Sequence, residues 1–382
     1  MKLAVLTETA AGESRVSIVP DSVRTLRDHG FDVVVQSGAG VRAFFPDAAY
    51  EQAGAAIFSS ATEALESASV VVHVRAPSAD AVRELPEGSV LIALLDALRD
   101  TSLVSQLAAR NVTGIAMELI PRITRAQSMD VLSSQATVAG YRAVLLAAAA
   151  TPRFFPMLMT AAGTIPPARV LVLGAGVAGL QAIATARRLG AVVSAFDIRP
   201  AVKEQVESLG ATFVGFQLSG SETAGGYAKE VSAAEQQREH EHLAGLMRDI
   251  DIVIATAQVP GRPAPRLITA DMVEAMKPGS VIVDIAAESG GNVELTRAGE
   301  EVVVNGVRIL GPVNLAGGLP AHASQMYSRN VTTLLGHMVR DGEFRVDLAD
   351  EIVGAACVSH DGQVRVARGQ PPVPTASAHQ PA

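Results

Sequence analysis

Short apolar runs and amphipathic segments alternate through the first third of the chain. The apolar runs predict strands at residues 2–7, 32–36, 70–74, 90–94 and 114–116. The amphipathic segments predict helices that include residues 20–29, 61–67 and 101–110. Strands that alternate with helices are typical of a doubly wound domain with a parallel sheet. The sequence therefore predicts an α/β domain here.

A second α/β pattern follows the first. Two long apolar segments, residues 134–151 and 322–339, predict long helices, and Pro152 ends the first of them. The apolar runs between these helices predict strands at residues 170–173, 191–196, 212–216, 251–255, 280–285 and 307–310. The predicted fold is α/β, with two doubly wound parallel-sheet domains joined by long crossing helices, and the second domain has the strand–helix alternation of a Rossmann domain.

The predicted domain boundaries make the first domain discontinuous. It would comprise residues 1–133 plus 322–366, and the Rossmann domain with its linking helix would comprise residues 134–321. Residues 367–382 are rich in Pro, Ala and Gln, which predicts a disordered tail.

The second domain opens with a complete dinucleotide-binding pattern. The strand ending at Leu173 runs into Gly174, Gly176 and Gly179, and a helix follows. The next apolar run ends on Asp197, 23 residues after Gly174. In this pattern the glycines permit a tight turn, close approach of the pyrophosphate and close helix packing, while the acid accepts hydrogen bonds from the adenosine ribose. Because a carboxylate repels a 2′-phosphate, the pattern predicts NAD(H) rather than NADP(H).

A second glycine segment, residues 37–43, formally fits the related pattern G-x-G-x-x-A. It runs directly into Phe44, Phe45 and Pro46, which would break a long helix. We therefore expect a turn here rather than a nucleotide site.

Composition narrows the class of protein. The 382 residues carry a net charge of −8, so we expect no nucleic-acid partner. The single cysteine, Cys357, fits a reducing compartment. The longest uncharged stretch near the middle, residues 170–186, contains the three glycines of the dinucleotide pattern, so we expect no membrane insertion. His240 and His242 are spaced i, i+2 and do not share a helix face, so we expect no metal site.

One further run carries a family resemblance. Residues 117–135, which include the sequence Arg-Ala-Gln-Ser-Met-Asp at 125–130, resemble the NAD(H)-binding domain I of proton-translocating nicotinamide nucleotide transhydrogenases. The resemblance continues through residues 159–169, the Gly174 loop, 203–210 and 222–230, and it leaves out only the tail.

The resemblance implies roles for individual residues. Those implied to hold the adenosine and pyrophosphate are Gly174, Gly176, Val177, Ala178, Gly179, Asp197, Ile198 and Arg199. Those implied to line the reacting nicotinamide end are Arg122, Gln127, Asp130 and Ser133, with Gln127 directed toward a second nucleotide. Gly225 and Tyr227 would belong to a loop that closes over the nucleotide, although a plain surface insertion fits the same polar segment. Without the resemblance, Asp130 would be interpreted as a helix cap paired with Arg122.

The resemblance also implies partners. NADP(H) would sit on a partner's domain III rather than on this chain. The chain would form a homodimer and would lie on the cytoplasmic face of the inner membrane through membrane subunits. Hydride transfer between two nicotinamides needs no acid–base group, but it does need the two carbons held about 3–3.5 Å apart with water excluded.

Two other functions stay open at this stage. Alanine dehydrogenase has the same two-domain plan, but it uses a Lys and a His in its first domain. Arg75 stands at the Lys position, residues 94–98 contain no His, and Glu288 aligns with a catalytic Asp of that enzyme. A non-catalytic NAD-binding sensor is the other alternative.

Overall fold

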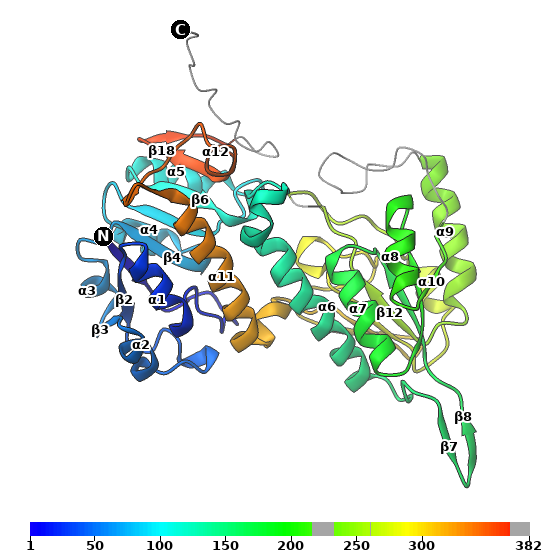
Figure 1. The fold of residues 1–382 in the computed structure, drawn as a ribbon. Coiled ribbons are helices and arrows are strands. Elements are labelled where there is room, and N and C mark those ends of the chain that lie inside the picture. The colour runs from blue at the N-terminus through cyan, green and yellow to red at the C-terminus, as the bar shows by residue number, and fades with distance from the viewer. Residues whose placement is uncertain (216–232, 260, 367–382) are drawn as a thin grey trace. The chain divides into compact units, whose positions relative to one another are not determined.

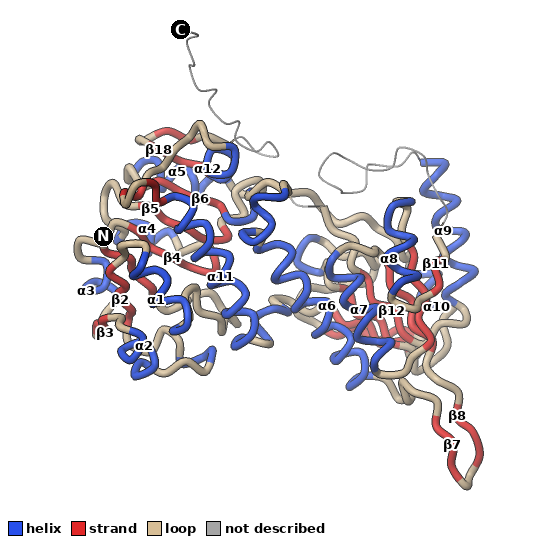
Figure 2. The backbone as a smooth tube through the Cα atoms, in the orientation of Figure 1, coloured by secondary structure: helices blue, strands red, loops and turns tan. Residues whose placement is uncertain are grey.

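The computed structural model describes residues 1–215, 233–259 and 261–366. The described residues form two compact units, one within residues 1–135 and 317–366 and one within residues 136–316. The boundary between residues 135 and 136 falls inside one helix, α6 (Val131–Ala150). Figures 1 and 2 show the two sheets and the helices that cover them.

Unit 1 is built on an eight-stranded sheet with the order β19-β18-β6-β5-β4-β1-β2-β3. Its strands are β1 (Lys2–Val5), β2 (Asp32–Gln36), β3 (Ala56–Phe58), β4 (Val70–Arg75), β5 (Val90–Leu94), β6 (Thr113–Ala116), β18 (Cys357–His360) and β19 (Gln363–Val364). β1 to β6 pair in parallel, whereas β18 joins β6 antiparallel. The sheet is thus mixed rather than purely parallel, because residues from the end of the chain add its last two strands.

Helices cover both faces of this sheet. They are α1 (Pro20–Asp28), α2 (Asp47–Ala53), α3 (Ala61–Leu65), α4 (Ala79–Glu84), α5 (Thr101–Ala109), α11 (Pro320–Met338) and α12 (Glu351–Ala356). Alternate strand residues face opposite sides: Val70 and Val72 pack with α1, α2 and α11, while Val71 packs with α3, α4 and α5. A short antiparallel hairpin, β16 (Val339–Arg340) and β17 (Glu343–Phe344), follows α11.

Unit 2 contains a seven-stranded sheet with the order β11-β10-β9-β12-β13-β15-β14. Its strands are β9 (Arg169–Leu173), β10 (Val192–Phe196), β11 (Thr212–Phe213), β12 (Ile252–Ala255), β13 (Val281–Asp284), β14 (Glu301–Val304) and β15 (Val307–Leu310). Among these described strands, β14 alone runs antiparallel to its neighbour. The order of the parallel strands is that of a Rossmann domain, and the strand order reverses between β9 and β12.

The helices of unit 2 are α6, α7 (Val177–Arg188), α8 (Lys203–Ser208), α9 (Ala233–Met247) and α10 (Ala270–Glu274). One face of the sheet packs against α6, α7 and α8, and the other packs against α9 and α10. A separate hairpin, β7 (Leu158–Thr160) and β8 (Gly163–Ile165), projects from this unit (Figure 1). Across the described residues no helix is long and apolar enough to cross a membrane.

The second glycine segment is a turn, as predicted. Gly38 adopts a positive φ of 80°, and a single 3₁₀ turn, Val41–Ala43, follows it. The side chain of Asp47 accepts hydrogen bonds from Ser37 Oγ at 2.7 Å and from the Gly38 N–H at 2.9 Å. A carboxylate therefore already occupies the donors that a phosphate would need.

Candidate nucleotide-binding site

The glycine loop lies between β9 and α7, at the end of the sheet where the strand order reverses. Gly174 has a φ of 88°, which favours glycine, and a Cβ there would lie 2.9 Å from Thr256 Oγ1. A Cβ on Gly179 would lie 1.9 Å from the Gly174 carbonyl oxygen, so only glycine lets α7 pack this closely against the loop. Gly176 caps the helix with no side chain, and among the described residues nothing lies within 4 Å of a Cβ built there. The start of α7 is thus free of a side chain at Gly176, and a glycine at a helix N-terminus fits a bound pyrophosphate.

Asp197 closes the site at the end of β10. Its side chain is only 5% exposed. It accepts a hydrogen bond from the Ala175 N–H at 2.7 Å, which ties it to the glycine loop. The backbone N–H of Arg199 and its guanidinium bind the same carboxylate. The structure thus brings Asp197 and Arg199 to the glycine loop, and Ile198 between them is half-buried against the α9 face of the sheet.

The residues that support this loop were not predicted from the sequence. Thr256 Oγ1, just after β12, donates to the Gly174 carbonyl at 2.9 Å. Asn292 accepts from the Ala257 N–H at 3.0 Å and donates to the Ala257 carbonyl at 2.8 Å. The only signal for them in the sequence was their position after strand-like runs.

Asp284 in turn holds the segment that carries Asn292. It accepts from the Val293 N–H at 3.0 Å and from Thr296 Oγ1 at 2.7 Å. Burial is the largest influence on its pKa and raises it, although these hydrogen bonds oppose the shift. A series of buried and partly buried hydrogen bonds therefore links the segment held by Asp284, through Asn292, to Ala257 beside the glycine loop.

The predicted nicotinamide-end residues lie in unit 1, around a 3₁₀ segment, Thr124–Met129. Asp130 follows this segment and accepts from Ser133 N–H at 2.9 Å and from Ser133 Oγ at 2.6 Å, the pattern of a helix cap on α6. Arg122 Nε lies 3.9 Å from Asp130 Oδ2. The structure thus brings Arg122, Asp130 and Ser133 together, and Gln127 is exposed on the same segment.

The remaining site predictions, Gly225 and Tyr227, lie outside the described residues. That their segment closes over a nucleotide stays a prediction.

Arg125 anchors the same 3₁₀ segment. Its guanidinium lies 3.5 Å from Asp350, a buried carboxylate that also pairs with His337 at 3.1 Å and with Arg340 at 3.2 Å. Asp350 caps α12 by accepting from the Ile352 and Val353 N–H groups. Burial alone would raise the pKa of Asp350, but the hydrogen bonds from His337 and the Val353 N–H outweigh it and lower the pKa.

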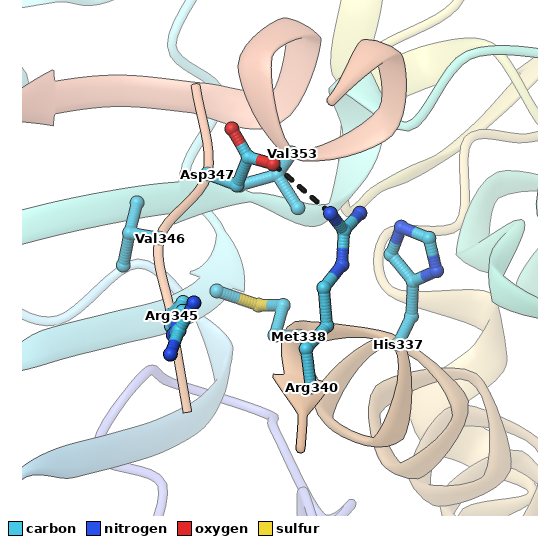
Figure 3. A pocket seen from close by; sticks show the side chains of 7 residues that line it. All are labelled: His337, Met338, Arg340, Arg345, Val346, Asp347 and Val353. Atoms are coloured by element: carbon cyan, nitrogen blue, oxygen red, sulfur yellow. Dashed lines mark hydrogen bonds and ion pairs between the residues drawn. The ribbon is translucent and has the colours of Figure 1, made fainter. Parts of the chain in front are cut away.

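A pocket of about 290 Å³ lies beside this anchor (Figure 3). The residues that line it are His337, Met338, Arg340, Arg345, Val346, Asp347 and Val353. Its arginine side chains already have acidic partners: Arg340 binds Asp347 and Asp350, and Arg345 binds Glu343. None of the predicted site residues within the described ranges lines this pocket, and we do not assign it to the nucleotide.

Two carboxylates, the buried Glu8 and the partly buried Glu118, bind the backbone at Arg75 and within residues 94–98. Glu8 accepts from the Val74 N–H at 2.6 Å and from the Arg75 N–H at 3.1 Å. Glu118 accepts from the Leu95 N–H at 3.0 Å and from the Ala97 N–H at 3.1 Å, and burial raises its pKa. The ends of β4 and β5 are therefore held by carboxylates bound to the backbone.

Fold and loop together define a Rossmann-type dinucleotide-binding protein with a second α/β unit. Comparison with known families specifies the class. The profile "Alanine dehydrogenase/PNT, N-terminal domain" matches residues 4–139, and the profile "Alanine dehydrogenase/PNT, C-terminal domain" matches residues 143–367. The chain belongs to the alanine dehydrogenase/PNT family, and within it to the NAD(P) transhydrogenase alpha subunits.

Individual relatives support this placement. The chain is 49% identical to an NAD(P) transhydrogenase subunit alpha protein of Rhodospirillum rubrum, over 95% of this chain and 97% of that protein. It is 32% identical to an alanine dehydrogenase of Halomonas elongata, over 95% and 94% of the two chains. The crystal structure of a transhydrogenase from Sinorhizobium meliloti matches with a TM-score of 0.83 and 47% identity, over 95% of this chain and 98% of that chain. The expected family resemblance is thus confirmed.

Proposed function

We propose that this chain is the NAD(H)-binding component of a proton-translocating transhydrogenase, which passes hydride between NADH and NADP⁺ held on a partner's domain III. The observation that carries the proposal is the glycine loop joined to a buried acid: Gly176 leaves the N-terminus of α7 without a side chain, and Asp197 accepts a hydrogen bond from the Ala175 N–H. The family membership and the 49% identity to a transhydrogenase subunit support the same function.

The chain's own residues would bind and orient rather than exchange protons. The α7 N-terminus would hold the pyrophosphate of NAD(H), and Asp197 would accept from the adenosine ribose. Arg122, Asp130 and Ser133 would orient the nicotinamide end, and Gln127 would contact the partner's nucleotide. Bound NADH supplies the hydride.

The proposal includes partners and location. NADP(H) is bound by domain III of the partner and not by this chain, and membrane subunits place the complex on the cytoplasmic face of the inner membrane. The chain itself would be a homodimer.

The test combines binding with transfer. NADH fluorescence can be titrated against little protein background because the chain contains no Trp. We expect tight binding of NADH, weaker binding of NADPH, and hydride transfer once a transhydrogenase domain III loaded with an NADP⁺ analogue is added. NADH binding without transfer would indicate a sensor instead.

Amino-acid oxidation is the second candidate, because the chain is 32% identical to an alanine dehydrogenase. Arg75 in place of the Lys of that enzyme and the absence of a His from residues 94–98 argue against it. We expect no reduction of NAD⁺ with alanine, and steady turnover in that assay would favour the dehydrogenase over the transhydrogenase.

A further inference from the structure

The carboxylate of Asp197 has a full set of hydrogen-bond donors. Oδ1 accepts from the Arg199 backbone N–H at 2.9 Å and from Arg199 Nε at 2.9 Å. Oδ2 accepts from the Ala175 N–H at 2.7 Å and from Arg199 Nη2 at 2.7 Å. An ionised carboxylate has about four lone-pair sites, so all of them have donors here.

A ribose diol would bring two further O–H donors to the same carboxylate. The two backbone donors are fixed by the loop and by the end of β10. Only the guanidinium of Arg199 is carried on a side chain that rotates. For the ribose to bind Asp197 through both hydroxyls, the guanidinium therefore has to give up its two positions.

The displaced guanidinium stays close to the ribose, because Arg199 follows Asp197 by only two residues. An arginine near the 2′ position is the feature by which Rossmann domains accept the 2′-phosphate of NADP(H). Asp197, which favours NAD(H), is thus bound in this chain to Arg199, a residue type that accommodates the 2′-phosphate of NADP(H).

We propose that Arg199 is a specificity-determining residue that competes with the ribose for Asp197. Because the guanidinium occupies the carboxylate, it weakens NADH binding. Because its positive charge offsets the negative charge of Asp197 and lies near the 2′ position, it also reduces the discrimination against NADPH. This inference rests on the proposed NAD(H) binding and concerns the selectivity of that site.

The primary test is Arg199→Met, with dissociation constants for NADH and NADPH measured by nucleotide fluorescence. We expect NADH to bind several-fold more tightly and NADPH several-fold more weakly, so that the ratio of the two constants changes tenfold or more. Unchanged dissociation constants, or weaker binding of both nucleotides, would overturn the proposal that Arg199 competes with the ribose.

A matched control is Arg188→Met. Arg188 is exposed in the last turn of α7, at the opposite end of the helix from the glycine loop, and its replacement makes the same change of net charge. Both constants should stay within twofold. Equal effects of the two substitutions would mean that net charge alone acts, which would also overturn the proposal.

Arg199→Lys keeps the test informative if the methionine variant unfolds. A lysine ammonium is a point charge and does not form the bidentate fork. NADH should bind more tightly than in the parent, while NADPH affinity is retained. If this variant binds NADH at the parent affinity, the competition does not exist.

A double-mutant cycle isolates the role of Arg199 toward the 2′-phosphate. Asp197→Asn should improve NADPH binding when Arg199 is present and should improve it much less together with Arg199→Met. Additive effects would contradict the proposal. A parent chain that binds no NADH at all would instead refute the proposed function, so the two failures are distinguishable.

Discussion

Gln127 is the residue that most sharply separates nucleotide affinity from hydride transfer. It is exposed on the 3₁₀ segment, whereas the glycine loop and Asp197 belong to the other unit. Rates of group transfer depend steeply on geometry, and a misplacement of about 1 Å can lower them on the order of 10²-fold.

We therefore expect Gln127→Asn, one methylene shorter, to leave NADH affinity within a few-fold while slowing transfer to domain III-bound NADP⁺ far more. NADH titration beside single-turnover transfer measures the two quantities. Transfer at the parent rate would show that this segment does not face the reacting carbons.

The raised pKa of Glu239 on α9 makes the stability of the fold depend on pH. Burial is the largest cause of its raised pKa; His240 opposes the shift and the negative charge of Asp197 adds to it. Above the ordinary value of 4.5, the folded state thus retains a proton that the unfolded state releases, so this group destabilises the fold progressively as pH rises through that window.

Glu239→Gln, which mimics the protonated acid, should therefore raise the melting temperature at pH 8 and change it little near pH 4. Glu241→Gln, an exposed position on the same helix, is the control and should show no such trend. Equal melting temperatures of the parent and Glu239→Gln at pH 8 would show that ionised Glu239 does not destabilise the fold.

At the scale of elements, the packing of α6 on α7 depends on one glycine. A Cβ on Gly140 of α6 would lie 2.1 Å from the Ala178 carbonyl oxygen in the first turn of α7. Neither backbone can give way cheaply, and overpacking of this kind typically costs about 1–3 kcal/mol.

We expect Gly140→Ala to lower the stability of the fold and to weaken NADH binding, because α7 carries the proposed pyrophosphate site. Gly245→Ala is a matched control: Gly245 is exposed in α9 and an added Cβ would meet no atom of the described residues within 4 Å, so alanine should stabilise the fold by about 0.5–1 kcal/mol. Thermal unfolding gives the melting temperature of each variant relative to the parent. Melting temperatures that shift in the same direction for both variants would contradict the prediction.

Elements with a strong local pattern were predictable from the sequence. The strands at residues 32–36, 90–94 and 307–310 are confirmed at those bounds, and the two long helices are confirmed within a few residues. The glycine loop was predictable for the same reason, since its turn, helix and acid lie within one short stretch of chain.

Two kinds of element were missed. β18 is a short strand defined by its bonds to the distant strand β6. The hairpin of β7 and β8 pairs locally, but it is mostly exposed and shows no buried face in its sequence. The supporting residues Thr256, Asn292 and Glu118 were missed because their partners are carbonyl and N–H groups of other segments. Hydrogen bonds to the backbone leave no pattern in a single sequence.

At the scale of the whole molecule, the hairpin of β7 and β8 bears on the proposed homodimer. Met159 is 79% exposed, and Met157 and Ile165 are also exposed. Large apolar side chains gathered on a projecting element are typical of an interface with another chain.

We expect the parent chain to have the mass of a dimer in solution and Met157→Glu/Met159→Glu to shift it toward the monomer. Val303→Glu, at an exposed apolar position on the edge strand β14, is the control and should remain dimeric. If the double variant stays dimeric, the hairpin is not the dimer interface.

The pairing of β18 with β6 has a consequence for synthesis on the ribosome. Cys357 pairs with Ile115 across most of the length of the chain, while unit 2 is one continuous segment of residues 136–316. At about 5–20 residues per second, roughly 10–50 s separate the emergence of the two strands. During that interval the edge of β6 stays open to pairing with other nascent chains. We expect the Rossmann unit to fold first, and the yield of folded protein to depend on how well chaperones cover the unpaired edge of β6 until β18 emerges.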